Sequence, residues 1–126
     1  MSTGQARKGE VTLQPEPESV PRARKFVAGL SLTDDEDKQS RLAAMTSELV
    51  SNAVLHARTP FELTVTVQEE RIRVSVSDGA EIFPGATTGD PSSLSGRGLR
   101  IVDRLADRWG IDPNAQGKTV WFEVDR

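Results

Sequence analysis

Residues 61–68 and 71–77 alternate apolar and polar positions, a pattern typical of strands that bury one face. Glu69 and Glu70 separate the two segments, so the pattern predicts a β-hairpin. The alternation places one apolar set on the buried face: Phe61, Leu63, Val65, Val67, Ile72, Val74 and Val76.

Apolar residues at helical spacing predict two helices before this hairpin. The first begins near Ser19, a residue type that caps helices well. The second runs from about Asp34 to Ala57. Residues 33–36 (Thr-Asp-Asp-Glu) match a capping box at its start, and Pro60 follows its end.

Shorter patterns predict the other elements: an edge strand at residues 10–14, a helix opened by Gly96-Arg97-Gly98, and strands at residues 109–111 and 119–124. We expect a disordered tail at residues 1–9 and a single domain at residues 10–126. Because most strands are linked as hairpins, this order predicts an α+β two-layer sandwich. Its sheet should be mixed and mostly antiparallel, with the helices on one face.

The 126 residues include 16 Lys and Arg against 19 Asp and Glu, a formal net charge of −3. Without a basic cluster, this balance argues against nucleic-acid binding. The chain has no cysteine and one histidine, which excludes thiolate zinc sites and multi-histidine sites. A metal would then be a hard cation on oxygen ligands. No stretch predicts a signal peptide or a membrane span, so we expect a cytoplasmic protein without membrane contact.

The second predicted helix carries a polar series beside its apolar stripe. Glu48, Asn52 and His56 are spaced at i, i+4 and i+8 and lie along one flank, about one turn apart. The Asn52 amide oxygen is a suitable ligand for Mg²⁺ held mostly by phosphates and waters. Glu48 could orient or deprotonate a nucleophile near a terminal phosphate. A solvated helix edge is the alternative interpretation.

Two features further along favour a nucleoside triphosphate site. Asp78 directly follows the second hairpin strand and could accept a hydrogen bond from an exocyclic amine, which favours adenine over guanine. Gly96, Gly98 and Leu99 lie at a predicted helix N-terminus, where backbone N–H groups bind anions. Residues 79–95 predict a long loop between them, and such loops are often functional. Each of these motifs alone is common or weak.

Together and in this order, the motifs resemble the Bergerat-fold ATP-binding superfamily, and within it the bacterial anti-sigma-factor serine kinases. The resemblance spans about residues 17–124. The series from Glu48 to Ala57 resembles the N box, and Asp78-Gly79-Ala80 stands at the G1 box. Gly96-Arg97-Gly98-Leu99 stands at the G2 box, and Gly117-Lys118-Thr119 fits the glycine–threonine step before the last strand.

The resemblance implies a protein that binds ATP and Mg²⁺ and phosphorylates a serine on an anti-sigma antagonist. Glu48 would be the general base, Asn52 would ligate Mg²⁺, and Asp78 would bind the adenine amino group with Thr119 nearby. The implied nucleotide site also includes Gly79, Gly96, Arg97, Gly98 and Leu99. The implied partners are a sigma factor, the antagonist protein and a second copy of the chain.

One motif departs from the family pattern. The G1 box is Asp-x-Gly-x-Gly, whereas this chain has Ala80 and Ile82 at the two later glycines. Both tolerate positive φ poorly, and Glu81 adds a negative charge. The departure favours an alternative function, a non-catalytic module of the same fold that sequesters a regulator with weak or no nucleotide binding. A histidine kinase catalytic domain is less favoured, because no phosphoacceptor helix pair precedes the domain.

Overall fold

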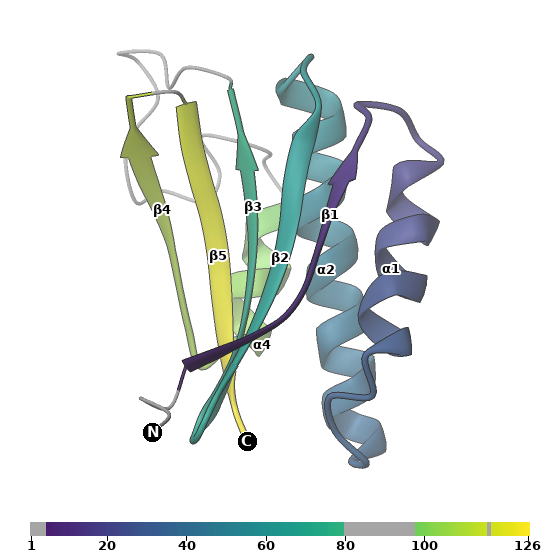
Figure 1. Ribbon diagram of the computed structural model, residues 1–126, viewed down its shortest axis with the longest axis vertical. Helices are drawn as coiled ribbons and strands as arrows, with labels where there is room; N and C mark the ends of the chain where they lie inside the picture. Colours follow the sequence, from purple (N-terminus) through teal and green to yellow (C-terminus); the bar gives the residue numbers. More distant parts are fainter. Residues whose placement is uncertain (1–4, 80–97, 116) are drawn as a thin grey trace.

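The computed structural model describes residues 5–79, 98–115 and 117–126, which form five strands and three helices (Figure 1). In chain order these are β1 (Gln5–Leu13), α1 (Ser19–Gly29), α2 (Glu36–His56), β2 (Phe61–Gln68), β3 (Arg71–Asp78), α4 (Gly98–Leu105), β4 (Arg108–Asn114) and β5 (Gly117–Asp125).

The strands form one sheet in the order β1-β2-β3-β5-β4, and each of the four pairings is antiparallel. Figure 1 shows α2 and α4 behind this sheet, with α1 beside α2. α2 contacts α1, α4, β3 and β5 and is therefore the central helix of the layer. The predicted α+β two-layer sandwich is confirmed, although the sheet is antiparallel throughout the described residues rather than mixed.

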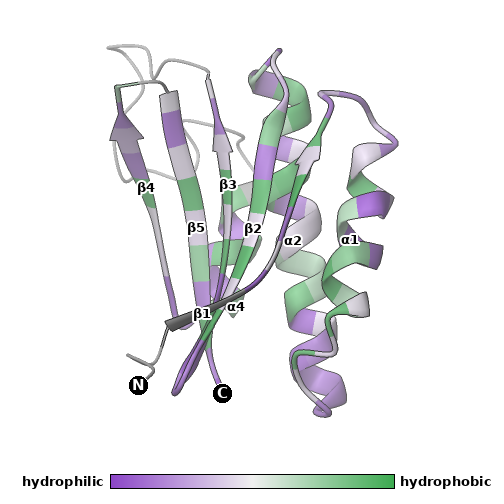
Figure 2. Cartoon of the chain, in the orientation of Figure 1, coloured by the Kyte–Doolittle hydropathy of each residue, from purple (hydrophilic) through white to green (hydrophobic). Residues whose placement is uncertain are grey.

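The core lies between the sheet and the helices. Alternate strand residues face it, as the sequence predicted, and Figure 2 shows the change of hydropathy along the strands. Burying a large apolar side chain contributes roughly 1.5–3 kcal/mol, so this layer is the main source of stability. The largest fully buried side chains are Phe61, Phe122, Met45, Leu49, Leu63, Ile72, Leu99, Val50, Val65, Val74, Val76 and Val102.

The first strand is longer than predicted. β1 begins at Gln5 rather than at Glu10 and pairs with β2, with a register irregularity between Arg7 and Gly9. A Cβ on Gly9 would lie 2.8 Å from Phe26 Cζ, so the glycine lets α1 pack against this strand. Residues 5–9 have no alternating apolar pattern that would predict a strand, and backbone pairing to β2 holds them in the sheet. They belong to the sheet and not to the predicted tail.

The start of α2 also differs from the prediction. The helix begins at Glu36 with Asp35 as its N-cap, and the Asp35 carboxylate accepts the Lys38 N–H at 3.1 Å. Thr33 Oγ1 accepts the Asp35 N–H, also at 3.1 Å. The prediction of a capping box that starts at Thr33 is therefore wrong. Asp35 caps the helix, and the threonine hydroxyl fixes the capping residue instead.

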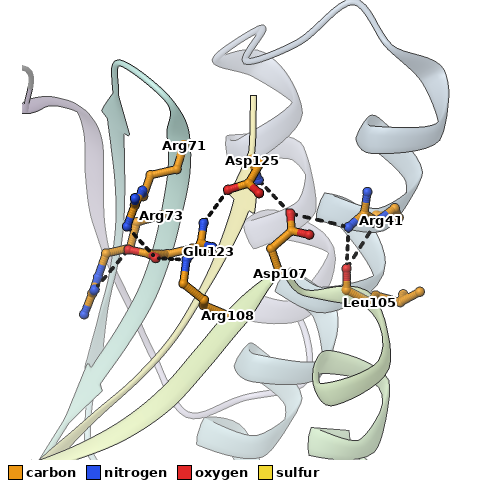
Figure 3. A network of polar contacts seen from close by, with 8 residues as sticks. All are labelled: Arg41, Arg71, Arg73, Leu105, Asp107, Arg108, Glu123 and Asp125. Carbon is orange, nitrogen blue, oxygen red and sulfur yellow. Dashed lines mark hydrogen bonds and ion pairs between the residues drawn. The ribbon is translucent and has the colours of Figure 1, made fainter.

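The face of the sheet opposite the helices carries an ion-pair cluster around Glu123 of β5 (Figure 3). The Glu123 carboxylate is 6% exposed. It accepts hydrogen bonds from Arg108 at 2.9 Å, Arg73 at 3.3 Å and Arg71 at 3.4 Å. The Arg73 guanidinium also lies 4.1 Å from the centroid of the Trp121 ring, a cation–π arrangement. The cluster links β3, β4 and β5 on their open side.

We predict that Glu123→Ala lowers the free energy of unfolding by about 2 kcal/mol, because three guanidinium groups lose a shared buried acceptor. Asp112→Ala is the matched control. The Asp112 carboxylate is 65% exposed and lies 4.0 Å from Arg73, so we expect a change below about 0.5 kcal/mol. Urea unfolding measures both values. Equal losses in the two variants would show that the cluster contributes no more than a surface ion pair.

Candidate functional site

The C-terminal half of α2, the end of β3 and the start of β5 meet at the upper end of the molecule in Figure 1. Asp78, the last residue of β3, is the register partner of Lys118 in β5. The side chains there enclose a cavity of about 10 Å³, which has room for about one water molecule. The cavity is lined by Leu49, Asn52, Ala53, His56, Val76, Asp78, Lys118 and Val120.

Asp78 and Lys118 form a buried ion pair. Lys118 Nζ donates to both carboxylate oxygens of Asp78 at 3.1 Å, and the side chains of Asp78 and Lys118 are 2% and 7% exposed. Burying an ion costs several kcal/mol unless a partner compensates it, so each charge here makes the other tolerable. The carboxylate predicted to bind a base amino group therefore contacts a cation of the chain itself.

Gly117 permits the close approach of β5 to the end of β3. Its φ is +153°, a backbone conformation that L residues rarely adopt. A Cβ at this position would lie 2.0 Å from the Asp78 carbonyl oxygen and 2.7 Å from Gly79 Cα. Any side chain would push the start of β5 away from Asp78. The glycine of the glycine–threonine step thus has a definite backbone role at the site.

Asn52 presents a buried amide oxygen to this region. The residue is 6% exposed, and its Oδ1 has no hydrogen-bond partner among the described residues. An unsatisfied buried acceptor costs about 1–3 kcal/mol, and an amide oxygen is an acceptable ligand for Mg²⁺. In the described part of the chain, no group of three or more His, Cys, Asp or Glu could hold a metal. An Mg²⁺ ion would therefore need phosphate oxygens and waters beside Asn52.

Glu48 lies one turn before Asn52 on α2 and is partly buried. Burial raises the pKa of its carboxyl group above the ordinary value, because the charged form loses hydration. A carboxylate with a raised pKa has a higher proton affinity, which suits the predicted general base. Glu48 does not line the small cavity, so the structure places it beside Asn52 along the helix and not against Asp78.

Thr119 lies on the opposite face of the sheet from the Asp78 carboxylate. Strand residues alternate between faces, so Lys118 faces the helices whereas Thr119 faces the open side. The Thr119 hydroxyl lies 2.8 Å from Ser77 Oγ on β3. Lys118, and not Thr119, therefore contacts the Asp78 carboxylate, and the role of Thr119 in nucleotide binding stays a prediction. Gly79 is exposed and follows Asp78 directly.

The G2 motif is only partly within the described residues. Gly96 and Arg97 lie outside them, as do residues 80–82 of the G1 box. Gly98 is the first residue of α4, and Leu99 is fully buried in the core. At the other end of α4, Arg41 donates to the Leu105 carbonyl at 2.5 Å and holds the helix against α2 (Figure 3). The phosphate-binding role of the G2 residues stays a prediction.

Lys118 is the site residue that the sequence analysis missed. A signal for it was present, because Val120, Phe122 and Val124 mark the buried face of β5. Extending that two-residue period by one step places Lys118 on the same face. A lysine at such a position needs an anion, and the register of β3 with β5 supplies Asp78.

No curated protein sequence matches the chain. Among the described residues, no helix combines the length and the hydrophobicity needed to span a membrane. The family of histidine kinase-like ATPase domains matches residues 13–124. That range includes α2, Asp78 and Lys118 and covers most of the 126 residues. The chain therefore belongs to the histidine kinase-like ATPase domain family and has its ATP-binding fold.

Proposed function

We propose that the protein is an ATP- and Mg²⁺-dependent serine kinase of the anti-sigma-factor type, which phosphorylates an antagonist protein and binds a sigma factor. The observation that carries the proposal is the buried Asn52 amide oxygen, which has no partner among the described residues. It lies one turn after the partly buried Glu48 carboxylate and lines a cavity together with Asp78. These residues would supply a metal ligand, a proton acceptor and a base acceptor.

In the proposed reaction, the substrate serine oxygen attacks the γ-phosphorus, and the bond between that phosphorus and the β–γ bridging oxygen breaks. ADP leaves with the bridging oxygen, and the serine proton passes to Glu48. Mg²⁺, when bound, would neutralise charge on the phosphates. Asn52 would position that ion, and Asp78 would orient the base. Burial of Glu48 supports its role, because the raised pKa favours proton uptake.

A second candidate function is a non-catalytic protein-binding module of the same fold. The Asp78–Lys118 ion pair favours it, because both oxygens of the base acceptor are already engaged. The replacement of two G1 glycines by Ala80 and Ile82 favours it as well. Calorimetric titration of the purified protein with ATP and Mg²⁺ separates the two functions. No binding at about millimolar nucleotide would favour the protein-binding module.

We predict that Glu48→Gln lowers phosphoryl transfer by about 10²- to 10⁴-fold, because an amide cannot accept the serine proton. ATP affinity should change by less than about threefold, because the carboxylate acts mainly in the transition state. The assay follows labelled γ-phosphate into an antagonist protein recovered by co-purification from native cells. Glu69→Gln, in the exposed turn between β2 and β3, is the charge-matched control. Transfer by Glu48→Gln at the wild-type rate would overturn the base assignment.

Burial of Glu48 also predicts a pH-dependent effect on stability. Its pKa is raised in the folded state, so the folded protein binds this proton more tightly, and ionisation favours unfolding. Glu48→Gln should therefore raise Tm at about pH 7. The gain should disappear as the pH falls below the ordinary glutamate value of 4.5. Thermal unfolding at both pH values measures the effect, and an equal gain at each would contradict its electrostatic origin.

We predict that Asn52→Leu removes the Mg²⁺-dependent part of ATP binding, a loss of about tenfold or more in affinity, because leucine offers no ligand oxygen. Asn52→Asp is the matched variant, because it keeps an oxygen at the same position and should retain the Mg²⁺ dependence. Titrations with ATP in the presence of Mg²⁺ and of EDTA measure the difference. An unchanged Mg²⁺ dependence in Asn52→Leu would remove Asn52 from the metal site.

A further inference from the structure

The Asp78–Lys118 ion pair brings a cation of the chain to the carboxylate assigned to the base. We propose that Lys118 is an internal competitor of the nucleotide, an inference that rests on the proposed ATP-binding function. The Lys118 ammonium group occupies the hydrogen-bonding position on Asp78 that the exocyclic amino group of adenine would take. ATP then binds only when the Lys118 side chain leaves Asp78.

On the side of the helices, the described residues around the pair leave no room for a base. Lys118 Nζ lies 3.1 Å from each carboxylate oxygen of Asp78, so both oxygens already accept a hydrogen bond from the chain. The adjoining cavity, which Asn52 and His56 also line, measures about 10 Å³. That volume accommodates about one water molecule and is far too small for a purine. A base that enters on the side of the helices therefore requires a group of the chain to move.

Within the described ion pair, the Lys118 side chain can move more easily than the backbone that carries it. The backbone on both sides of the pair is fixed, because Asp78 and Lys118 are register partners in the sheet. Gly117 packs directly against the Asp78 carbonyl group, which holds the start of β5 in place. The lysine ammonium, in contrast, is carried on a flexible four-carbon stem. An exchange of ammonium for amine can therefore occur without a change of register.

Because ATP is negatively charged, the direction in which its affinity changes on removal of Lys118 distinguishes a competitor from an ordinary cationic contact. ATP is a polyanion, so a lysine that contacts it or only adds positive potential strengthens its binding, and loss of that lysine weakens it. A lysine that competes for Asp78 has the opposite effect. Its removal strengthens binding, because ATP no longer has to break a buried ion pair and the carboxylate gains its partner from the ligand.

The experiment is calorimetric titration with ATP and Mg²⁺ of the wild type, Lys118→Met and Lys118→Thr. We expect both variants to bind ATP at least about tenfold more tightly than the wild type. Lys25→Met, which removes an exposed lysine on α1, is the charge-matched control and should bind as the wild type does. The double variant Asp78→Asn, Lys118→Met should show no gain, because the gain depends on the freed carboxylate.

A measurement on the unaltered protein keeps the test independent of how the variants fold. Lysine-selective ¹⁵N–¹H correlation spectra should show one ammonium signal protected from exchange in the ATP-free protein, absent from Lys118→Thr. Saturation with ATP should abolish that protection.

The outcomes separate this inference from the proposed function. Equal or weaker ATP binding by both Lys118 variants, with binding by the wild type intact, would overturn the competitor role alone. An ammonium signal that stays protected under saturating ATP would also overturn the competitor role and leave the proposed ATP binding intact. Binding of ATP by the variants but not by the wild type would support the competitor role, because Lys118 would then prevent ATP binding in the wild type. No binding by any of the proteins would overturn ATP binding, and the competitor role with it.

Discussion

The antiparallel register between β3 and β5 decides what lies on each face of the molecule. It pairs Asp78 with Lys118 on the side of the helices, and Arg73 with Glu123 on the open side. A slip of one residue would move every side chain of a strand to the opposite face. The buried valines would then meet solvent, and the charged residues of the open side would enter the core. The apolar layer, the buried ion pair and the Glu123 cluster therefore depend on the same set of backbone hydrogen bonds.

Helix α2 adds the second constraint, because its apolar stripe packs on the sheet in one orientation. That orientation carries Asn52 into the core beside Asp78 and Lys118, while Glu48 stays at the edge of the same layer. Three polar side chains thus share a small volume that is otherwise apolar. Two of them satisfy each other, whereas the Asn52 amide oxygen has no partner in the part of the chain that the structure describes. Such a concentration of buried polar groups is costly to folding and is typical of a binding site.

Family membership defines the fold around this site, whereas the side chains near Asp78 define its local chemistry. The match over residues 13–124 assigns the fold of the histidine kinase-like ATPase domains. Under the proposed function, individual side chains near the site would act on how readily a base reaches Asp78. Lys118 neutralises that carboxylate from within. The departures at Ala80 and Ile82 change the neighbouring G1 box. The family match therefore does not fix the strength of nucleotide binding, which under the proposed function would depend on these side chains.

The sequence by itself determined the features that follow from local periodicity. The hairpin of β2 and β3, the extent of α2 to within two residues at its start, and the shared flank of Glu48 and Asn52 all follow from apolar spacing. The two-layer sandwich followed from the order of these elements. Periodicity is a local property, because each element must bury one face wherever the rest of the chain lies.

Only the tertiary structure decided the features that depend on partners far away in the chain. Residues 5–9 became a strand through backbone pairing with β2, which leaves no trace in their side chains. Lys118, and not Thr119, reached Asp78 across a separation of 40 residues. Lysine and threonine can both donate a hydrogen bond to a carboxylate, so residue type alone did not distinguish Lys118 from Thr119. The choice between them was made by the register of two strands, and a register belongs to the pair and not to either segment.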